Sequence, residues 1–176
     1  MTRLFIVFLM LTSVSVAGAQ QPDLQSAMVA YIGEWASDEK TREDGTTHRF
    51  HYSLQPFDQS GQIVEMTIRM IDEFGTETLL WRGFKGWDAV REVGYYHAAS
   101  PSGRFADGHV FLSENVDLVT EYRGVDPVQG ENQIRDIFAP VTDGQFSSTT
   151  YIRRGGEWVE ILHDTWTSTD ELTHLP

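Results

Sequence analysis

Residues 145–167, QFSSTTYIRRGGEWVEILHDTWT, decide the fold that we expect for this chain. Two runs rich in Thr, Tyr, Ile, Val and Trp flank Gly155 and Gly156, and a Gly-Gly pair suits a two-residue turn with positive φ at both positions. The stretch therefore predicts a β-hairpin in which Ser148 pairs with His163. One face of this hairpin carries no acid and no Arg, so we expect that face, with Ser148 and His163, to point into the interior.

The rest of the chain repeats this pattern of short runs rich in β-branched and aromatic residues, separated by Asp-Gly, Ser-Gly and Phe-Gly turn signals. With the hairpin, we expect strands near residues 34–39, 47–57, 62–71, 77–84, 91–97, 108–113, 117–123, 132–139, 145–154 and 157–167. Only Pro22–Ile32 shows a helical period of apolar residues, and Gly33 ends that helix. Strands joined by short turns predict an all-β, antiparallel up-and-down barrel of about eight to ten strands with a short N-terminal helix.

Two further hairpins bear on which side chains face inward. An odd-length loop at Gln59-Ser60-Gly61 turns Tyr52 and Met66 into the interior together. The next hairpin, around residues 72–75, leaves two registers open: a three-residue loop turns Thr78, Leu80, Arg82 and Phe84 inward, and a two- or four-residue loop turns Leu79 and Trp81 inward instead. If Arg82 points inward, it is a buried cation that requires an acidic side chain or an anionic ligand.

The composition excludes several classes of function. The chain has 26 acidic residues against 13 Lys and Arg, a formal net charge of −13, and such an acidic surface repels nucleic acids and anionic lipids. It has no Cys, which rules out disulfides, thiolate nucleophiles and cysteine-ligated metals. The sequence also lacks a nucleophile elbow, a phosphate-binding glycine loop and the HxH or HExxH spacing of metal ligands, so we expect no metal site.

Residues 1–19 have the features of a secretory signal peptide. Arg3 supplies the positive start, Leu4 to Leu11 form a short apolar region, and Ala17-Gly18-Ala19 fits a cleavage site. This pattern predicts a periplasmic or secreted protein with one domain, residues 20–176. No other stretch reaches the length of about 20 apolar residues that a spanning helix needs, so we expect no membrane insertion.

The element Ile32-Gly33-Glu34-Trp35, in which a Gly-x-Trp follows a short helix and opens the first strand of a meander, resembles the lipocalins and the wider calycin superfamily. It is most similar to small exported bacterial lipocalin-like domains. The resemblance implies a barrel with an interior cavity, in which Trp35 plugs the closed end and a basic side chain from a late strand, Arg153 or Arg154, packs across it. It implies no particular ligand.

The mostly apolar interior predicts a small-molecule-binding barrel that holds a largely apolar or flat ligand. We expect its contacts to include Tyr52, Met66, Arg82, Ser148 and His163. No cofactor is required, although an inward His163 could bind the iron of a haem. Two alternatives stay open: an isomerase or hydrolase with His163 as its base, and a filled barrel with a structural or protein-interaction role.

Overall fold

The computed structural model describes residues 23–57, 62–88 and 90–169. The expected signal peptide and the expected Gln59-Ser60-Gly61 turn lie outside these residues, and they stay predictions. Among the described residues, no helix is both long and apolar enough to cross a bilayer.

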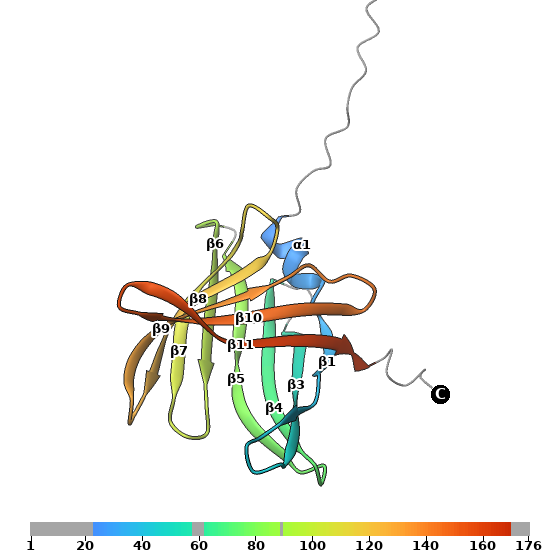
Figure 1. Ribbon diagram of the computed structural model, residues 1–176. Helices are drawn as coiled ribbons and strands as arrows, with labels where there is room; N and C mark the ends of the chain where they lie inside the picture. Colours follow the sequence, from blue (N-terminus) through green and yellow to red (C-terminus); the bar gives the residue numbers. More distant parts are fainter. Residues whose placement is uncertain (1–22, 58–61, 89, 170–176) are drawn as a thin grey trace, which may run out of the picture.

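Ten antiparallel strands close into a barrel, as the sequence predicts (Figure 1). Each strand pairs with its neighbour along the chain, and β1 closes the ring because it pairs with both β3 and β11. The ring consists of β1 (Gly33–Ser37), β3 (Thr47–Pro56), β4 (Ile63–Asp72), β5 (Glu77–Asp88), β6 (Val93–Ala99), β7 (Phe105–Leu112), β8 (Leu118–Asp126), β9 (Gly130–Phe138), β10 (Gln145–Arg154) and β11 (Glu157–Ser168). A further short strand that the sequence did not predict, β2 (Lys40–Thr41), pairs with β3 beside the ring.

One end of the barrel is covered by α1 (Leu24–Val29), the blue helix at the top of Figure 1. Asp23 caps this helix by accepting a 2.7 Å hydrogen bond from the Ser26 backbone N–H. Met28 is fully buried, and the Tyr31 hydroxyl bonds to the backbone carbonyl of Ala139 at 2.8 Å. The helix is shorter than predicted, and Gly33, with a φ of +142°, opens β1 behind it.

Trp35 is buried at this covered end. Its Nε1 donates a 2.8 Å hydrogen bond to the Tyr31 carbonyl, and its ring meets the Phe146 ring edge-on. Among the cation–ring contacts of the described residues none involves Trp35, so the expected basic cover from Arg153 or Arg154 is wrong. The reason is geometric: the β10–β11 turn lies at the opposite end of the barrel, where the Arg153 guanidinium lies over Trp158 instead.

Two β-bulges alter the register of the sheet. Between β4 and β5, Arg69 faces Leu79 and Ile68 faces Trp81, so Leu80 is an extra residue. Between β10 and β11, Tyr151 faces Glu160 and Thr150 faces Leu162, so Ile161 is an extra residue. Because side chains alternate along a strand, each extra residue reverses the faces of everything beyond it.

The bulge at Leu80 resolves the register that the sequence left open. The loop itself has three residues, since the Asp72 backbone N–H bonds to the Thr76 carbonyl at 3.1 Å and Met70 faces Thr78. That loop alone would turn Arg82 inward. The bulge turns Arg82 outward, toward Glu65, and places Lys85 in the interior.

The bulge at Ile161 overturns one prediction. The register next to the Gly155-Gly156 turn is as expected, but beyond the bulge Ser148 faces Asp164 rather than His163. His163 is therefore exposed on the outer surface, where its Nδ1 lies 2.9 Å from the Thr149 hydroxyl. Asp164, which the unbroken register placed outside, is buried and only 3% exposed.

Small residues line part of the inner wall. Gly83, Ala98, Ala106 and Gly124 face one another in turn across β5, β6, β7 and β8. Nearby, Gly108 lies between Tyr96 and Tyr122, and a Cβ there would lie 2.1 Å from the Glu121 carbonyl oxygen. The Tyr96 and Tyr122 rings meet at a centroid distance of 5.0 Å. A Cβ at Gly83 would likewise lie 2.1 Å from the His97 carbonyl oxygen, so these glycines allow close packing of neighbouring strands and rings.

Candidate functional site

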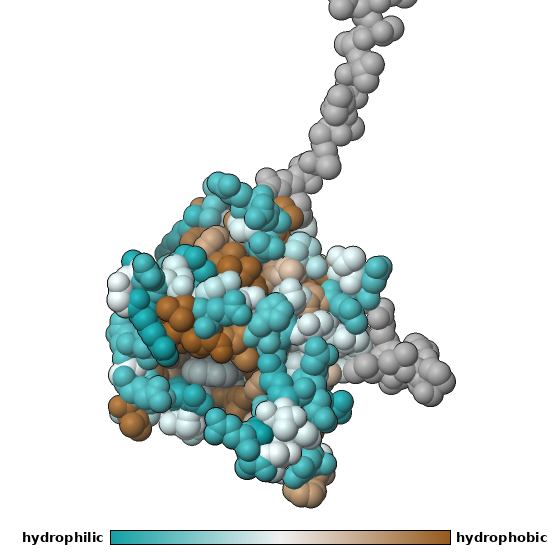
Figure 2. Space-filling model, in the orientation of Figure 1, coloured by the Kyte–Doolittle hydropathy of each residue, from teal (hydrophilic) through white to brown (hydrophobic). Residues whose placement is uncertain are grey.

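A cavity of about 400 Å³ lies inside the barrel, on the side away from α1. Most of its lining is apolar or aromatic, and both bulges contribute to it with two consecutive side chains each, Leu80 and Trp81, and Ile161 and Leu162. Its polar lining residues are Lys85, Arg104, Asp136, Ser148, Thr150 and Asp164. In Figure 2, apolar brown surface gathers around a recess on the front face, below the position of β11 in Figure 1.

Lys85 is the most unusual of these polar residues. It is only 2% exposed, and its Nζ lies 4.3 Å from the centre of the Phe138 ring and 5.7 Å from that of Tyr96. Among the described residues, no acceptor lies within hydrogen-bond distance of this nitrogen and no carboxylate lies within 4.0 Å of it. Burial lowers the pKa of Lys85 to about 8, although the charge of Asp136 acts to raise it.

Asp136 projects from β9 into the same cavity, two positions from Phe138. The Thr150 hydroxyl donates a 2.7 Å hydrogen bond to its carboxylate. Burial raises the pKa of Asp136, while Thr150, Lys85 and Tyr122 act to lower it. Burial thus shifts the pKa of the Lys85 amine and that of the Asp136 carboxyl group in the directions that favour their neutral forms.

Three tyrosines complete the interior around this pair. Burial raises the pKa of Tyr52, Tyr96 and Tyr122 above the ordinary value of 10.0, and the negative charge of Asp136 adds to the effect. These phenols therefore remain neutral at physiological pH. They offer hydroxyl groups and flat rings to whatever occupies the cavity.

An ion pair lies at the edge of the cavity. Lys40 of β2 lies 2.6 Å from the Asp164 carboxylate and also donates a 3.1 Å hydrogen bond to the His163 carbonyl. The charge of Asp164 is therefore compensated within the protein. This pair links β2 to β11 beyond the few residues through which β1 and β11 are paired.

Three of the five residues predicted as ligand contacts line the cavity: Tyr52, Met66 and Ser148. Ser148 accepts a 2.8 Å hydrogen bond from Trp166 Nε1. The other two lie on the outer surface, Arg82 with Glu65 and His163 with Thr149. His163 is therefore unable to act as an interior base, to pair with Ser148 or to bind the iron of a haem inside the barrel.

Sequence reasoning missed Lys85, Asp136 and Asp164. For Asp136 a signal was present, because Ile134, Asp136 and Phe138 alternate and place one acid on an otherwise apolar face. For Lys85 and Asp164 there was none, since their direction depends on bulges within the apolar runs Leu79-Leu80-Trp81 and Ile161-Leu162.

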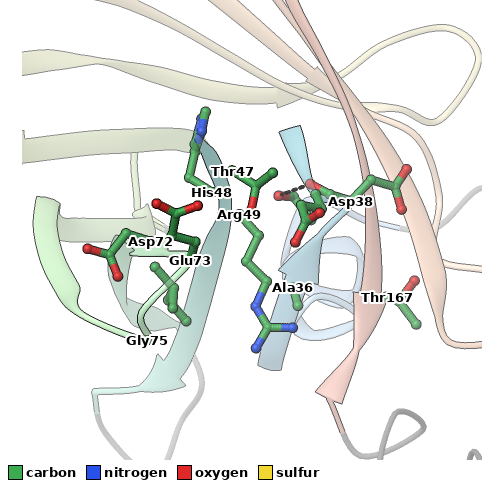
Figure 3. Close-up of a pocket in the computed structure, with 12 residues that line it drawn as sticks. Ala36, Asp38, Thr47, His48, Arg49, Asp72, Glu73, Gly75 and Thr167 are labelled. Atoms are coloured by element: carbon green, nitrogen blue, oxygen red, sulfur yellow. Dashed lines mark hydrogen bonds between the residues drawn. The ribbon is translucent and has the colours of Figure 1, made fainter. Parts of the chain in front are cut away.

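A larger hollow of about 460 Å³ lies outside the barrel, between β1, β3 and the β4–β5 turn (Figure 3). His48 and Arg49 project from β3 in opposite directions there, and the carboxylates of Asp72 and Asp38 lie on different sides. Two of its polar side chains already serve the backbone: the Asp72 carboxylate accepts from the Phe74 and Thr76 N–H groups, and the Ser37 hydroxyl accepts from the Phe50 N–H. The hollow also lacks the apolar walls of the interior cavity. We therefore place the candidate site in the interior cavity.

Metal ligands are not grouped in the parts of the chain that the structure describes: no three His, Asp or Glu side chains are arranged to hold an ion. No protein-family model and no curated protein matches the chain. A functional interpretation therefore depends on the cavity and its chemistry.

Proposed function

We propose that this protein binds a small, largely apolar molecule inside its barrel. The observation that carries the proposal is the interior cavity of about 400 Å³, with aromatic and aliphatic walls and a few polar groups. Ligand pockets for small molecules typically have volumes of about 300–1,000 Å³ and this kind of lining. Because α1 covers one end of the barrel, such a ligand can enter through the recess on the side away from it.

The open interior supports binding over a filled barrel. The aromatic and aliphatic side chains that line the cavity leave about 400 Å³ between them. Barrels of this size hold either packed side chains or one small ligand. An interior kept open at some loss of packing energy favours the second use.

The order of elements supports a lipocalin-like carrier. A short helix, the Gly33-x-Trp35 element and an up-and-down barrel follow one another as that resemblance implies. With residues 1–19 as a signal peptide, the carrier would act in the periplasm or outside the cell. Its partner is then a small hydrophobic molecule, and its acidic exterior disfavours nucleic acids.

The test is a titration of the purified protein with Nile red, a neutral, flat and apolar dye, followed by dye fluorescence and native mass spectrometry. Wild type should bind one dye molecule. Ile134→Trp, which fills the cavity, should weaken binding about tenfold or more. Ile137→Trp adds the same ring three positions along β9, at a residue outside the cavity lining, and should leave the affinity unchanged. No binding by wild type, or equal effects of the two substitutions, would contradict the proposal.

A further inference from the structure

Lys85 is the one buried Lys or Arg in residues 23–57, 62–88 and 90–169. Its nitrogen lies against the faces of Phe138 and Tyr96 rather than against an acceptor. Placing an ammonium ion in an apolar site without an ion pair is costly, and such a lysine either meets a partner or gives up its proton. We therefore expect the ligand to supply the group that interacts with the Lys85 nitrogen.

The chain offers an internal comparison, because it contains only two lysines, Lys40 and Lys85. Lys40 is 27% exposed and its nitrogen is already engaged by the Asp164 carboxylate and the His163 carbonyl. Lys85 faces the cavity with no such contacts in the described residues. The Lys85 amine is thus available to a molecule in the cavity, whereas the Lys40 amine is already paired within the protein.

We propose that Lys85 captures an aldehyde or ketone in the cavity by forming an imine with its carbonyl carbon. This inference rests on the proposed function and names the chemical class of the ligand: an apolar, flat body that carries a carbonyl group. Buried lysines in apolar surroundings are the amines best suited to this reaction, since only the neutral amine is a nucleophile.

The reaction needs no oxidant or reductant. The neutral Lys85 amine adds to the carbonyl carbon, so that a C–N bond forms and the carbonyl π electrons move to oxygen. One proton passes from nitrogen to that oxygen, which gives a carbinolamine. The hydroxyl group then takes a second proton and leaves as water, while the nitrogen lone pair forms the C=N bond. Amine, carbonyl and one acid proton thus yield a protonated imine and water.

Asp136 is positioned to supply that acid proton. It lines the same cavity, and its carboxyl group is displaced toward the protonated form. Once it has given up the proton, its carboxylate compensates the positive charge of the imine across the cavity. The other titratable or charged side chains that line the cavity are Tyr52 of β3, Tyr96 of β6 and Tyr122 of β8, which stay neutral, Asp164 of β11, which is paired with Lys40, and Arg104, which lies over the Trp81 ring.

The availability of the free amine supports the assignment. With a pKa of about 8, about a tenth of the Lys85 side chains are unprotonated at pH 7. A solvated lysine with its usual pKa is unprotonated in fewer than about one molecule in a thousand. Lys85 should therefore react with a carbonyl ligand at neutral pH, where an ordinary lysine reacts slowly.

The experiment incubates the full chain with trans-cinnamaldehyde, a flat, apolar, conjugated aldehyde, and sodium cyanoborohydride, which reduces an imine to a stable amine. Intact mass and peptide mapping then count and locate the cinnamyl groups. We expect one group on Lys85, formed about tenfold or more faster than on Lys40, while peptide mapping separates any label on the terminal amine. Lys85→Arg should remove this fast label, and Lys40→Arg should keep it.

Labelling of wild type by itself distinguishes the two lysines, so the test does not depend on whether Lys85→Arg folds. Equal labelling of Lys40 and Lys85, or no label on Lys85, would overturn the imine. If Nile red binds and Lys85 stays unlabelled, the carbonyl inference fails and the proposed binding function stands. If Nile red does not bind, the proposed function itself fails.

Discussion

Burial governs the chemistry of single side chains in this barrel. Lys85 and Asp136 line one cavity inside the barrel, and the pKa of each is shifted toward the neutral form because charge is poorly solvated there. Arg82, three positions before Lys85 on the same strand, is exposed and pairs with Glu65 in solvent. These two basic residues of β5 therefore differ because Arg82 points into the solvent and Lys85 points into the barrel.

Lys85→Met should change how the free energy of unfolding depends on pH. The pKa of Lys85 is about 8 in the folded chain against its usual 10.5, so between these values the unfolded state binds more protons. Wild type should therefore gain stability relative to Lys85→Met as the pH rises from 8 to 10.5, by about 3 kcal/mol. Urea denaturation across this pH range measures the difference.

Arg82→Met provides the matched control on the outer face of β5. The substitution leaves Lys85 in place, so the difference between wild type and Arg82→Met should stay constant with pH. A constant difference for Lys85→Met as well would show that the amine has an ordinary pKa in the folded chain.

Most of the correct predictions from the sequence concern the number and position of the strands. Turn signals such as Gly155-Gly156 locate the hairpins well, and all ten predicted strands are present in the ring. Alternation also predicts the inward direction of Tyr52 and Met66. These features depend on neighbouring residues, and local sequence is enough to specify them.

The bulges are the part that local sequence does not specify. At both sites the extra residue lies in an apolar run, Leu79-Leu80-Trp81 or Ile161-Leu162, so no break in the polar–apolar alternation marks its position. What selects the bulge is the curvature that the closed barrel requires there. For this reason an unbroken register favoured His163 over Asp164 on β11, and the length of the β4–β5 loop was not enough to decide the direction of Arg82.

Deletion of Ile161 tests this interpretation. Removing the extra residue leaves every other pair of β10 and β11 in place, so the chain should still fold, with a loss of about 1–2 kcal/mol. Deletion of Thr149 is the control, because β10 is regularly paired there with both β9 and β11. That deletion should abolish cooperative thermal unfolding followed by circular dichroism. Equal damage from both deletions would contradict a specific bulge at Ile161.

Closure of the barrel depends on one short seam. Strand β1 pairs with β11 only from Trp166 to Ser168. The next links along β11 are the 3.2 Å hydrogen bond from the Asp38 N–H to the Thr165 carbonyl and the contact of Lys40 with Asp164 and His163. The remaining neighbours in the ring are paired over longer stretches, as β3 and β4 are from His48 to Pro56. The stability of the closed form should therefore respond strongly to Lys40.

Lys40→Met should destabilise the barrel by about 3 kcal/mol, because it leaves the buried Asp164 carboxylate without its partner. The double variant Lys40→Met, Asp164→Leu removes both charges and should recover most of that loss. Guanidinium denaturation of the two variants and wild type gives the three values. A double variant no more stable than Lys40→Met would show that the ion pair is not the source of the effect.

The same seam leaves one stretch of backbone without a lateral neighbour. From Glu157 to Leu162, β11 pairs with β10 on one side, and no β1 residue pairs with it on the other. An exposed strand edge of this kind is a template onto which a strand from another chain can add. The extra residue at Ile161 interrupts the regular spacing of donors and acceptors along that edge, and bulges are one of the means by which proteins discourage such addition. The irregularity that turns Asp164 inward therefore also protects the chain against intermolecular sheet formation.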